Sequence, residues 1–565
     1  MPPPLLLWFL GVTLAAAAVL AYGRRQLARR LAGLREAWGL PRDIDRDMWS
    51  IARYYRMRVQ ADKTVNSLDD RTWADLDMDG LFSVLDRTQS GVGRQFLYAR
   101  LRIQPTEAQR LAFESLVSRI GNDRAARESA QMALSRLGDA SAYDLATLAQ
   151  PGAFNSRPWH LVFPILGIAM VISVGATAVM PAAIFVLAAG AVISLILRGT
   201  VAHNLRIVAS AFRQVGPLLA AADGIAALNS PSVSLVFGGL ESDVRRLARL
   251  RRYAAWAGRE SSAASPGDLS GLVLEYLNLL FCLDANALFF GARELRLRAP
   301  ELLRVIDAVG EVDAALSIAS YRAGTSGWCS PTILPARSSV RMVNVRHPLL
   351  RDAVPNTVTL APPHGLIITG SNMSGKSTFL RTVGVTTVLA QTISTCLADA
   401  YEAPPLIVRS CIGRNDDMSQ GKSYYMVEVE MVIDLVLAAQ TPVPHLILFD
   451  ELFRGTNAVE RIAAGEAVLA ALMAAAPHAP GPAHVVIAAT HDQELVDLLD
   501  GIYAPFHFSD TIDSEGLAFD YRLRPGPAAT RNAIALLGLR GAPPELVARA
   551  LARAKVMDQA RGTVL

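Results

Sequence analysis

Residues 366–390 read LIITGSNMSGKSTFLRTVGVTTVLA, and they decide the fold of the C-terminal part of the chain. The segment from Gly370 to Ser377 fits the phosphate-loop pattern GxxxxGK[ST]. A strand-like apolar run precedes the loop and a helix-like stretch follows it, so backbone N–H groups of the loop and the helix N-terminus are placed to bind phosphates. Lys376 supplies a mobile positive charge to the β and γ phosphates, and the hydroxyl of Ser377 is placed to bind Mg²⁺.

A pair of carboxylates follows later in the chain. Residues 446–451, LILFDE, read as a buried strand that ends in Asp450 and Glu451. Asp450 is placed to hold Mg²⁺ through water, and Glu451 to orient or deprotonate the attacking water. His491 follows a third apolar strand, HVVIAAT, where it suits sensing of a γ-phosphate. The alternatives are an ordinary acidic cap for the pair and a structural role for the histidine.

Short β-type runs alternate with helical stretches after residue 325, which predicts an α/β domain with a largely parallel sheet over residues 336–565, ending in a helical tail. Upstream, residues 23–158 and 199–335 show helical spacing of Ala, Leu, Arg and Glu. The predicted strands are residues 340–345, 357–360, 365–369, 406–409, 445–449 and 485–489.

Two apolar stretches predict membrane spans. Residues 4–22 carry no charge and are followed by arginines, which favours an N-terminal anchor over 1–22 rather than a cleaved signal. Residues 161–197 also lack charge and fit two short spans joined by a turn, a hairpin over 159–198. The alternative is a helical hairpin buried in protein. The resulting prediction is a multi-pass protein of the inner, cytoplasmic membrane with its ATPase domain in the cytoplasm.

Composition excludes several classes of protein. With 52% hydrophobic and 19% charged residues, the chain is neither disordered nor collagen-like. The formal net charge of +4 is too small to indicate nucleic-acid binding by itself. Four well-separated cysteines form no CxxC pair, so they predict reduced, structural thiols rather than a zinc ribbon or a disulfide scaffold.

Four segments together resemble the ATPase domain of the MutS mismatch-repair family. They are TGSNMSGKSTFLR at 369–381, DDMSQGKSYYMVEVE at 416–430, LFDELFRGTN at 448–457 and ATHDQEL at 489–495. The likeness is strong over 340–539, and residues 85–101, LDRTQSGVGRQFLYARL, resemble the start of the family's helical core domain. The chain therefore resembles a membrane-anchored MutS-family member that lacks the mismatch-recognition domain. The expected fold class is multidomain: transmembrane helices and a helical core and lever region, then an ABC-like α/β phosphate-loop ATPase domain.

The resemblance implies a homodimeric ATPase with two composite sites that use ATP and Mg²⁺. Glu451, His491 and Ser423 would be catalytic, with Ser423 reaching the γ-phosphate bound by the other subunit. Ser377 and Asp450 would hold the metal, and Asn356 would lie near the base. The remaining ATP contacts would come from the loop residues Gly370, Ser371, Asn372, Met373, Ser374, Gly375, Lys376, Ser377 and Thr378.

Three positions depart from the family pattern. Phe453 stands where the family usually has a small residue, and Arg461 replaces a usual glycine. Ala353 stands about where a base-stacking aromatic residue is expected. These departures bear on adenine binding and on hinge geometry, not on the residues that carry hydrolysis.

A dense basic run lies in the helical region, with Arg245, Arg249 and Arg252 on one face of a helix. Such a face can contact DNA phosphates, anionic lipid headgroups or only water. By resemblance, ATP turnover would switch a dimer that clamps mismatched or branched DNA. The alternative is an ABC-like ATPase that couples nucleotide closure to the membrane hairpin without nucleic acid. The intact carboxylate pair argues against a third class, a scaffold that holds ATP without turnover.

Overall fold

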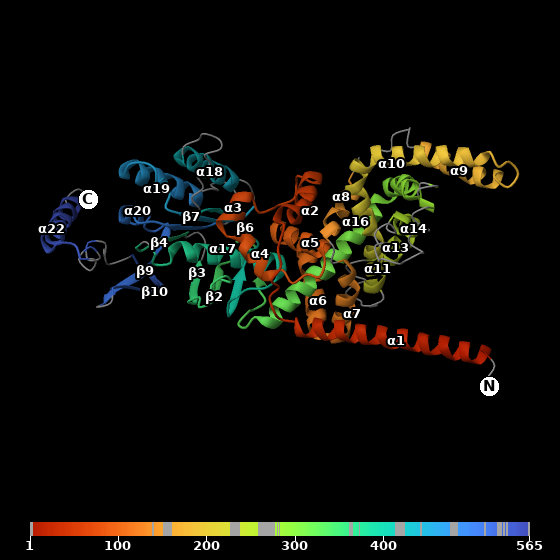
Figure 1. Ribbon diagram of the computed structural model, residues 1–565. Helices are drawn as coiled ribbons and strands as arrows, with labels where there is room; N and C mark the ends of the chain where they lie inside the picture. The colour runs from red at the N-terminus through yellow and green to blue at the C-terminus, as the bar shows by residue number, and fades with distance from the viewer. Residues whose placement is uncertain are drawn as a thin grey trace. The chain divides into compact units, whose positions relative to one another are not determined.

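The computed structural model describes residues 4–137, 140–150, 161–226, 238–257, 277–278, 281, 283–360, 365–371, 373–412, 424–440, 443–474, 484–513, 516–527, 534, 537 and 541–562. The chain divides into two compact units (Figure 1). The helical unit comprises Met1–Lys63, Val84–Ala99 and Glu107–Thr325. The sheet unit comprises Thr64–Ser83, Arg100–Thr106 and Ser326–Leu565.

The helical unit is built around α16 (Leu283–Gly324), the longest helix of the described residues. This helix contacts α6, α7, α11, α13 and α14. It is kinked at Arg298, just before Pro300, because proline removes a backbone donor and its ring clashes with the preceding turn. The other helices with residues in this unit are α1 (Pro4–Glu36), α2 (Met48–Ala61), α4 (Met78–Leu85), α5 (Gly91–Arg102), α6 (Glu107–Asn122), α7 (Arg124–Leu134), α8 (Leu145–Leu148), α9 (Val162–Ala176), α10 (Ala183–Arg213), α11 (Val215–Ala226), α13 (Leu240–Arg246) and α14 (Ala248–Ala257).

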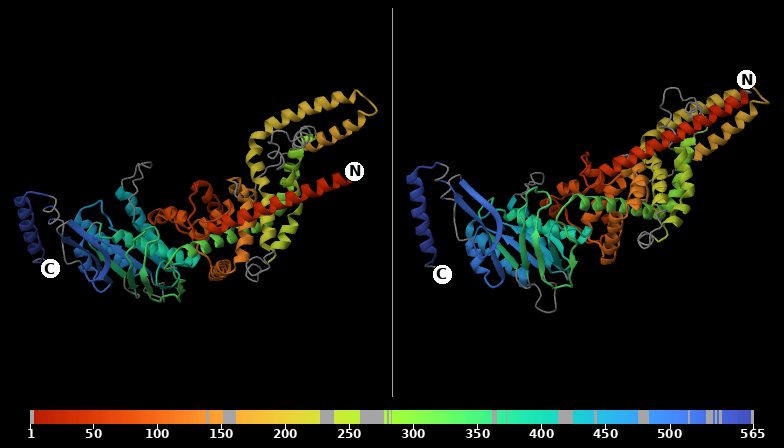
Figure 2. Two further views of the ribbon diagram at one scale, coloured as in Figure 1. Left: turned by 60° about the horizontal axis from the view of Figure 1, so that its bottom comes forward. Right: turned by 90° about the horizontal axis from the view of Figure 1, so that it is seen from below.

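The predicted membrane anchor and hairpin are wrong. Among the described residues, no helix is both long enough and apolar enough to cross a bilayer. The stretch 161–197 is split by a turn into α9 and α10, which lie side by side (Figure 2). With 15 residues, α9 is about 22 Å long, short of the roughly 30 Å of a hydrocarbon core. The stretch 4–22 is the first part of α1, which continues unbroken through the arginines to Glu36. The inner-membrane location rested on these spans and is wrong as well.

The sheet unit contains a six-stranded sheet with the order β10-β9-β4-β8-β7-β6. All neighbours pair in parallel except β9 and β10. The strands are β4 (Gly365–Thr369), β6 (Ile407–Cys411), β7 (His445–Asp450), β8 (Val485–Ala489), β9 (Tyr503–Asp513) and β10 (Gly516–Pro525). All five residues of β4 and of β8 are buried, because parallel strands covered on both faces need continuous apolar runs.

Helices cover both faces of this sheet (Figure 1). On one face Ile447 and Phe449 pack into a core with apolar residues of α18 (Tyr424–Ala439), α19 (Ala458–Ala474) and α20 (Gln493–Leu498). On the other face Leu448 lies against α17 (Lys376–Ile393), where a Cβ on Gly384 would come within 2.8 Å of it. A larger residue at position 384 would have to displace the ends of buried leucine side chains, so glycine lets the phosphate-loop helix approach the sheet closely.

A second sheet belongs to the same unit and has the strand order β1-β5-β2-β3. Its edge strand β1 spans only two residues, and β2 lies in the interior between β5 and β3. The strands are β1 (Thr332–Ile333), β2 (Val340–Val345), β3 (Asn356–Leu360) and β5 (Ala400–Ala403), and the helix near the C-terminus of the chain is α22 (Pro544–Gly562).

An early segment of the chain completes the sheet unit beside β6. It contains α3 (Asp70–Asp75), whose last residue is buried. The Asp75 carboxylate accepts hydrogen bonds from Ser410 Oγ at 2.8 Å and from the backbone N–H of Ile412 at 2.9 Å. Arg381 of α17 donates to the Asp75 carbonyl at 2.8 Å. One aspartate thus joins the early segment to both the sheet and the phosphate-loop helix.

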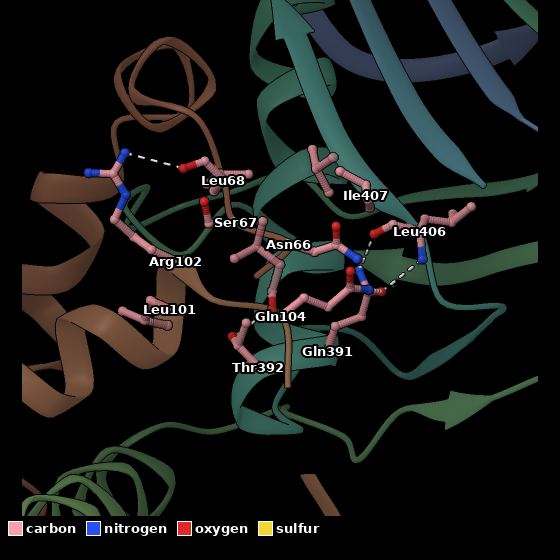
Figure 3. A pocket seen from close by; sticks show the side chains of 12 residues that line it. Asn66, Ser67, Leu68, Leu101, Arg102, Gln104, Gln391, Thr392, Leu406 and Ile407 are labelled. Carbon is pink, nitrogen blue, oxygen red and sulfur yellow. Dashed lines mark hydrogen bonds between the residues drawn. The ribbon is translucent and has the colours of Figure 1, made fainter. Parts of the chain in front are cut away.

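Residues 100–106 also lie against α17, around a small pocket (Figure 3). The side-chain amide of Gln391 both donates to the Leu406 carbonyl at 2.9 Å and accepts from the Leu406 N–H at 2.8 Å. Gln104 donates to the same amide oxygen of Gln391 at 3.0 Å. The end of α17 is therefore fixed by polar contacts to an early part of the chain and to the start of β6.

We expect Asp75→Ala to destabilise the sheet unit by about 2–3 kcal/mol, because it leaves the buried N–H of Ile412 without its acceptor. Urea unfolding should show the loss, and hydrogen exchange over residues 407–412 should assign it to this unit. The control is Asp497→Ala, which removes an exposed carboxylate of the same unit. A change no larger than that of the control would contradict the assigned role of Asp75.

Candidate active site

The phosphate loop joins the buried strand β4 to the N-terminus of α17. Gly370 and Gly375 have φ values of +143° and +113°, which residues with a Cβ rarely adopt. A Cβ on Gly370 would also lie 2.8 Å from the carbonyl oxygen of Phe508. The first N–H groups of α17 have no partners within the helix, so the loop presents donors at the positive end of a helix.

The side chains of the loop fit an anion. Lys376 is 5% exposed, and its Nζ donates to the carbonyl oxygens of Gly370 at 2.8 Å and Ser371 at 3.0 Å. The hydroxyls of Ser371 and Ser374 are buried without a hydrogen-bond partner among the described residues. A buried cation beside orphaned hydroxyls is the donor set that a phosphate chain would satisfy.

Ser377 and Asp450 meet at the carboxyl end of the sheet. Ser377 Oγ, in the first turn of α17, donates to Asp450 Oδ2 at 2.5 Å. Burial raises the pKa of Asp450, the hydrogen bond from Ser377 opposes this shift, and the charge of Glu451 adds to it. A hydroxyl and a carboxylate at this edge are oxygen ligands of the kind that Mg²⁺ prefers, so the pair fits the predicted metal.

Glu451 follows β7 with a positive φ of 59°. Its Oε1 forms an ion pair with Nε2 of His491, and its Oε2 lies 2.8 Å from Nε of Arg454. Burial alone would raise the pKa of Glu451, but the hydrogen bond from His491 and the charges of His491, Arg454 and Lys376 outweigh burial and lower it. Glu451 is therefore held as a carboxylate.

The loop after Glu451 is anchored by a residue that sequence reasoning missed. Glu428 of α18 is 4% exposed, and its Oε1 accepts a hydrogen bond from the backbone N–H of Phe453 at 2.6 Å. Burial raises the pKa of Glu428, while hydrogen bonds from the N–H groups of Phe453 and Arg454 oppose that shift. The side chain of Phe453 is buried in the core shared with α18 and α19. A glutamate on an otherwise apolar helix face, within the segment 416–430, was the available signal.

Arg461, the second departure from the family pattern, has a partner in this chain. Its guanidinium contacts both carboxylate oxygens of Asp492, at 2.7 and 2.8 Å. Asp492 directly follows His491, so this pair fixes α19 to the loop that carries the histidine. The larger side chain is therefore accommodated by a bidentate ion pair.

Asn356 lies at the start of β3 and holds β10 beside the loop. Its amide donates to the Tyr521 carbonyl at 3.0 Å and accepts from the Leu523 N–H at 2.7 Å. Tyr521 has a φ of +54° within the irregular part of β10, and a Cβ on Gly375 would lie 3.4 Å from its ring. This exposed aromatic ring beside the phosphate loop was not predicted.

Of the other residues predicted for the nucleotide site, Met373 is exposed on the loop and Thr378 is exposed in the first turn of α17. Asn372 and Ser423 lie outside the described residues. The three arginines predicted to contact DNA or lipid, Arg245, Arg249 and Arg252, belong to the helical unit and are all exposed. They lie on two short helices, α13 and α14, rather than on one continuous helix.

Comparison with known proteins agrees with this geometry. Residues 366–558 match the family model of MutS domain V. The DNA mismatch repair protein MutS of Thermus aquaticus is 35% identical over 221 residues, which are 38% of this chain and 26% of that protein. The MutS of Thermus caldophilus is 33% identical over 279 residues, 48% of this chain and 32% of that protein. DNA mismatch repair protein MutS 2 of Halobacterium salinarum is 31% identical over 274 residues, 46% of this chain and 30% of that protein.

The chain thus spans about a third or less of the length of these relatives. The matched part of the chain is similar to domain V of MutS and to the ATPase domain of the MutS type. The resemblance deduced from the four sequence segments is confirmed for this domain.

We expect Glu428→Ala to lower kcat for ATP about tenfold with a smaller change in KM, because a buried N–H loses its acceptor and the loop after Glu451 shifts. Glu428→Gln keeps an acceptor oxygen and should stay within about threefold of wild type. Glu430→Ala, on the same helix but exposed, is the control. Equal losses in the Ala and Gln variants would show that the negative charge matters rather than the acceptor. Steady-state phosphate release measures all four proteins.

Proposed function

We propose that this chain hydrolyses ATP to ADP and phosphate with Mg²⁺, and that turnover switches a dimer that binds DNA. The observation that carries the hydrolytic part is the meeting of the phosphate loop, Asp450 and Glu451 at one edge of the sheet. Ser377 donates to Asp450 there, and Glu451 is the next residue along the chain. The loop supplies hydrogen-bond donors to the phosphates, and Asp450 supplies a ligand for the metal. Glu451 supplies a carboxylate that can accept a proton from the attacking water.

Each residue has a distinct task in this proposal. The loop N–H groups and Lys376 bind the phosphates, and Ser377 and Asp450 hold the metal. Bound Mg²⁺ would neutralise charge that develops on the phosphate oxygens. Glu451 accepts a proton from the attacking water once one of its oxygens is released from His491 or Arg454. His491 then contacts the γ-phosphate.

The base of the nucleotide would lie beside Tyr521. This ring is next to the start of α17, and Asn356 fixes the backbone on both sides of it. An exposed aromatic face is suited to stacking on adenine. Tyr521 would therefore take the role that sequence comparison expected near Ala353.

The dimer is proposed from the family resemblance together with the segment 416–430. Ser423 supplies a short hydroxyl donor, and Lys422 adds positive charge beside it. In a composite site, Ser423 of one subunit reaches the γ-phosphate held by the other. The relatives are named as DNA mismatch repair proteins, which supports DNA as the partner of such a dimer.

The basic residues of the helical unit are the proposed DNA contacts. Arg245, Arg249 and Arg252 are exposed and form no ion pair with a described residue, so their charges are available to phosphates. The lipid contact and the ABC-like coupling to a hairpin both rested on the membrane spans, which are wrong.

We expect Glu451→Gln to bind ATP but to lose at least about a hundredfold in turnover, since the shape is kept while the basic carboxylate is removed. Lys376→Ala should instead weaken nucleotide binding. Fluorescent-nucleotide titration and phosphate release separate the two effects, and Asp497→Asn controls for loss of a carboxylate elsewhere in the unit. Normal turnover of the Glu451 variant would refute the proposed role of this carboxylate.

We expect duplex DNA to stimulate ATP turnover, and a triple variant with Gln at 245, 249 and 252 to lose that stimulation. Basal turnover should not change, because these residues lie in the other unit. Because three phosphate contacts are removed, the plot of log K against log salt for duplex DNA should become shallower, its slope smaller in magnitude by about 2.7. The control is a triple variant with Gln in place of Arg24, Arg25 and Arg29, which are exposed on α1; it removes the same three positive charges at another place. Equal effects of the two triple variants would mean that only net charge matters.

A further inference from the structure

Two cysteines face each other across a pair of backbone hydrogen bonds in the sheet unit. Cys329 N–H donates to the Cys396 carbonyl at 2.8 Å, and Cys396 N–H donates to the Cys329 carbonyl at 3.0 Å. They form an antiparallel bridge, so their side chains lie on the same face with Cα atoms about 5.5 Å apart. That separation lies in the range of protein disulfides, and a modest approach of the two Cβ atoms would allow the bond.

The two thiols differ in accessibility and in acidity. Cys329 is partly exposed, whereas Cys396 is fully buried. The hydrogen bond from the Cys396 thiol lowers the pKa of Cys329, and burial only partly opposes this. An accessible thiol of lowered pKa beside a buried second thiol is the arrangement of an attacking and a resolving cysteine.

We propose that Cys329 and Cys396 form a reversible disulfide when the protein meets a hydroperoxide such as hydrogen peroxide. The Cys329 thiolate attacks one peroxide oxygen, the O–O bond breaks, and a sulfenic acid and hydroxide form. The Cys396 sulfur then attacks the Cys329 sulfur and displaces the oxygen, which leaves as water with the Cys396 proton. Two thiols lose two electrons in total, and the peroxide is reduced to two waters.

The disulfide would cross-link the segment through which the chain enters the second sheet. Cys329 lies between the end of α16 and the edge strand β1, which pairs with β5 over only two residues. Cys396 follows the end of α17, whose first residue is Lys376 of the phosphate loop. Oxidation would therefore tie the segment just before β1 to the segment after α17, which two backbone hydrogen bonds between the cysteines join in the reduced protein.

Peptide mass spectrometry of the full-length protein tests this directly. Trypsin places Cys329, Cys396 and Cys411 on separate peptides, residues 323–337, 382–409 and 410–414. After treatment with hydrogen peroxide and blocking of free thiols with N-ethylmaleimide, we expect the first two peptides to be linked, with the loss of two hydrogens. Dithiothreitol should separate them. Cys411 is the internal control, because burial raises the pKa of its thiol to about 12 and it should stay reduced.

Variants and a second measurement make the test decisive. Cys329→Ser and Cys396→Ala should each abolish the linked peptide. Hydrogen exchange over residues 328–334 should slow by roughly tenfold on oxidation of the wild type and remain unchanged in both variants. Further oxidation of Cys329 without linkage, or no reaction at either thiol, would overturn the proposal. So would linkage between chains, detected as mixed-isotope peptide pairs when ¹⁵N-labelled and unlabelled proteins are oxidised together.

Discussion

The positive φ angles of the loop between β4 and α17 are the constraint on which the nucleotide site depends. They turn the chain from a buried strand into a buried helix within six residues. Because the carboxyl ends of parallel strands meet at one edge, β7 and β8 bring Asp450, Glu451 and His491 to the same place. The close approach at Gly384 then fixes the helix on the sheet, so loop and carboxylates are held by one core.

The loop, the strands around it and the acidic pair could be predicted because their signals are local: spacing of glycines, short apolar runs and the residues that end them. Contacts made across hundreds of residues carry no such signal. Asp75 sits in a helical pattern, and nothing near it indicates that it accepts hydrogen bonds from Ser410 and Ile412. The sequence of 161–197 predicted two helices joined by a turn, but its hydropathy did not show that α9, with 15 residues, is too short to span a membrane.

Phe453, which departs from the family pattern, shows how contacts with surrounding residues outweigh the backbone preference of a single residue. Phe453 is held at φ +56° because its side chain is buried while its N–H is bonded to Glu428. The same glutamate stands on α18, within the segment 416–430 that also contains Ser423. A movement of that segment toward a partner's nucleotide therefore acts on the acceptor that positions the loop after Glu451. If Ser423 makes the proposed contact in trans, α18 would connect that contact to the carboxylate that would activate water.

Glu451 itself shows why such a connection is needed. Its two oxygens are occupied, one by His491 and the other by Arg454, and these two partners lower its pKa. A carboxylate so engaged is a weak base, since its lone pairs already accept hydrogen bonds. Asp450, one residue earlier, is shifted in the opposite direction, and its pKa is raised by burial. Adjacent carboxylates with opposite shifts are suited to different tasks. Asp450 is held at the end of a strand and is suited to binding a cation. Glu451 lies on a loop and becomes a base only when its contact to His491 or Arg454 is broken.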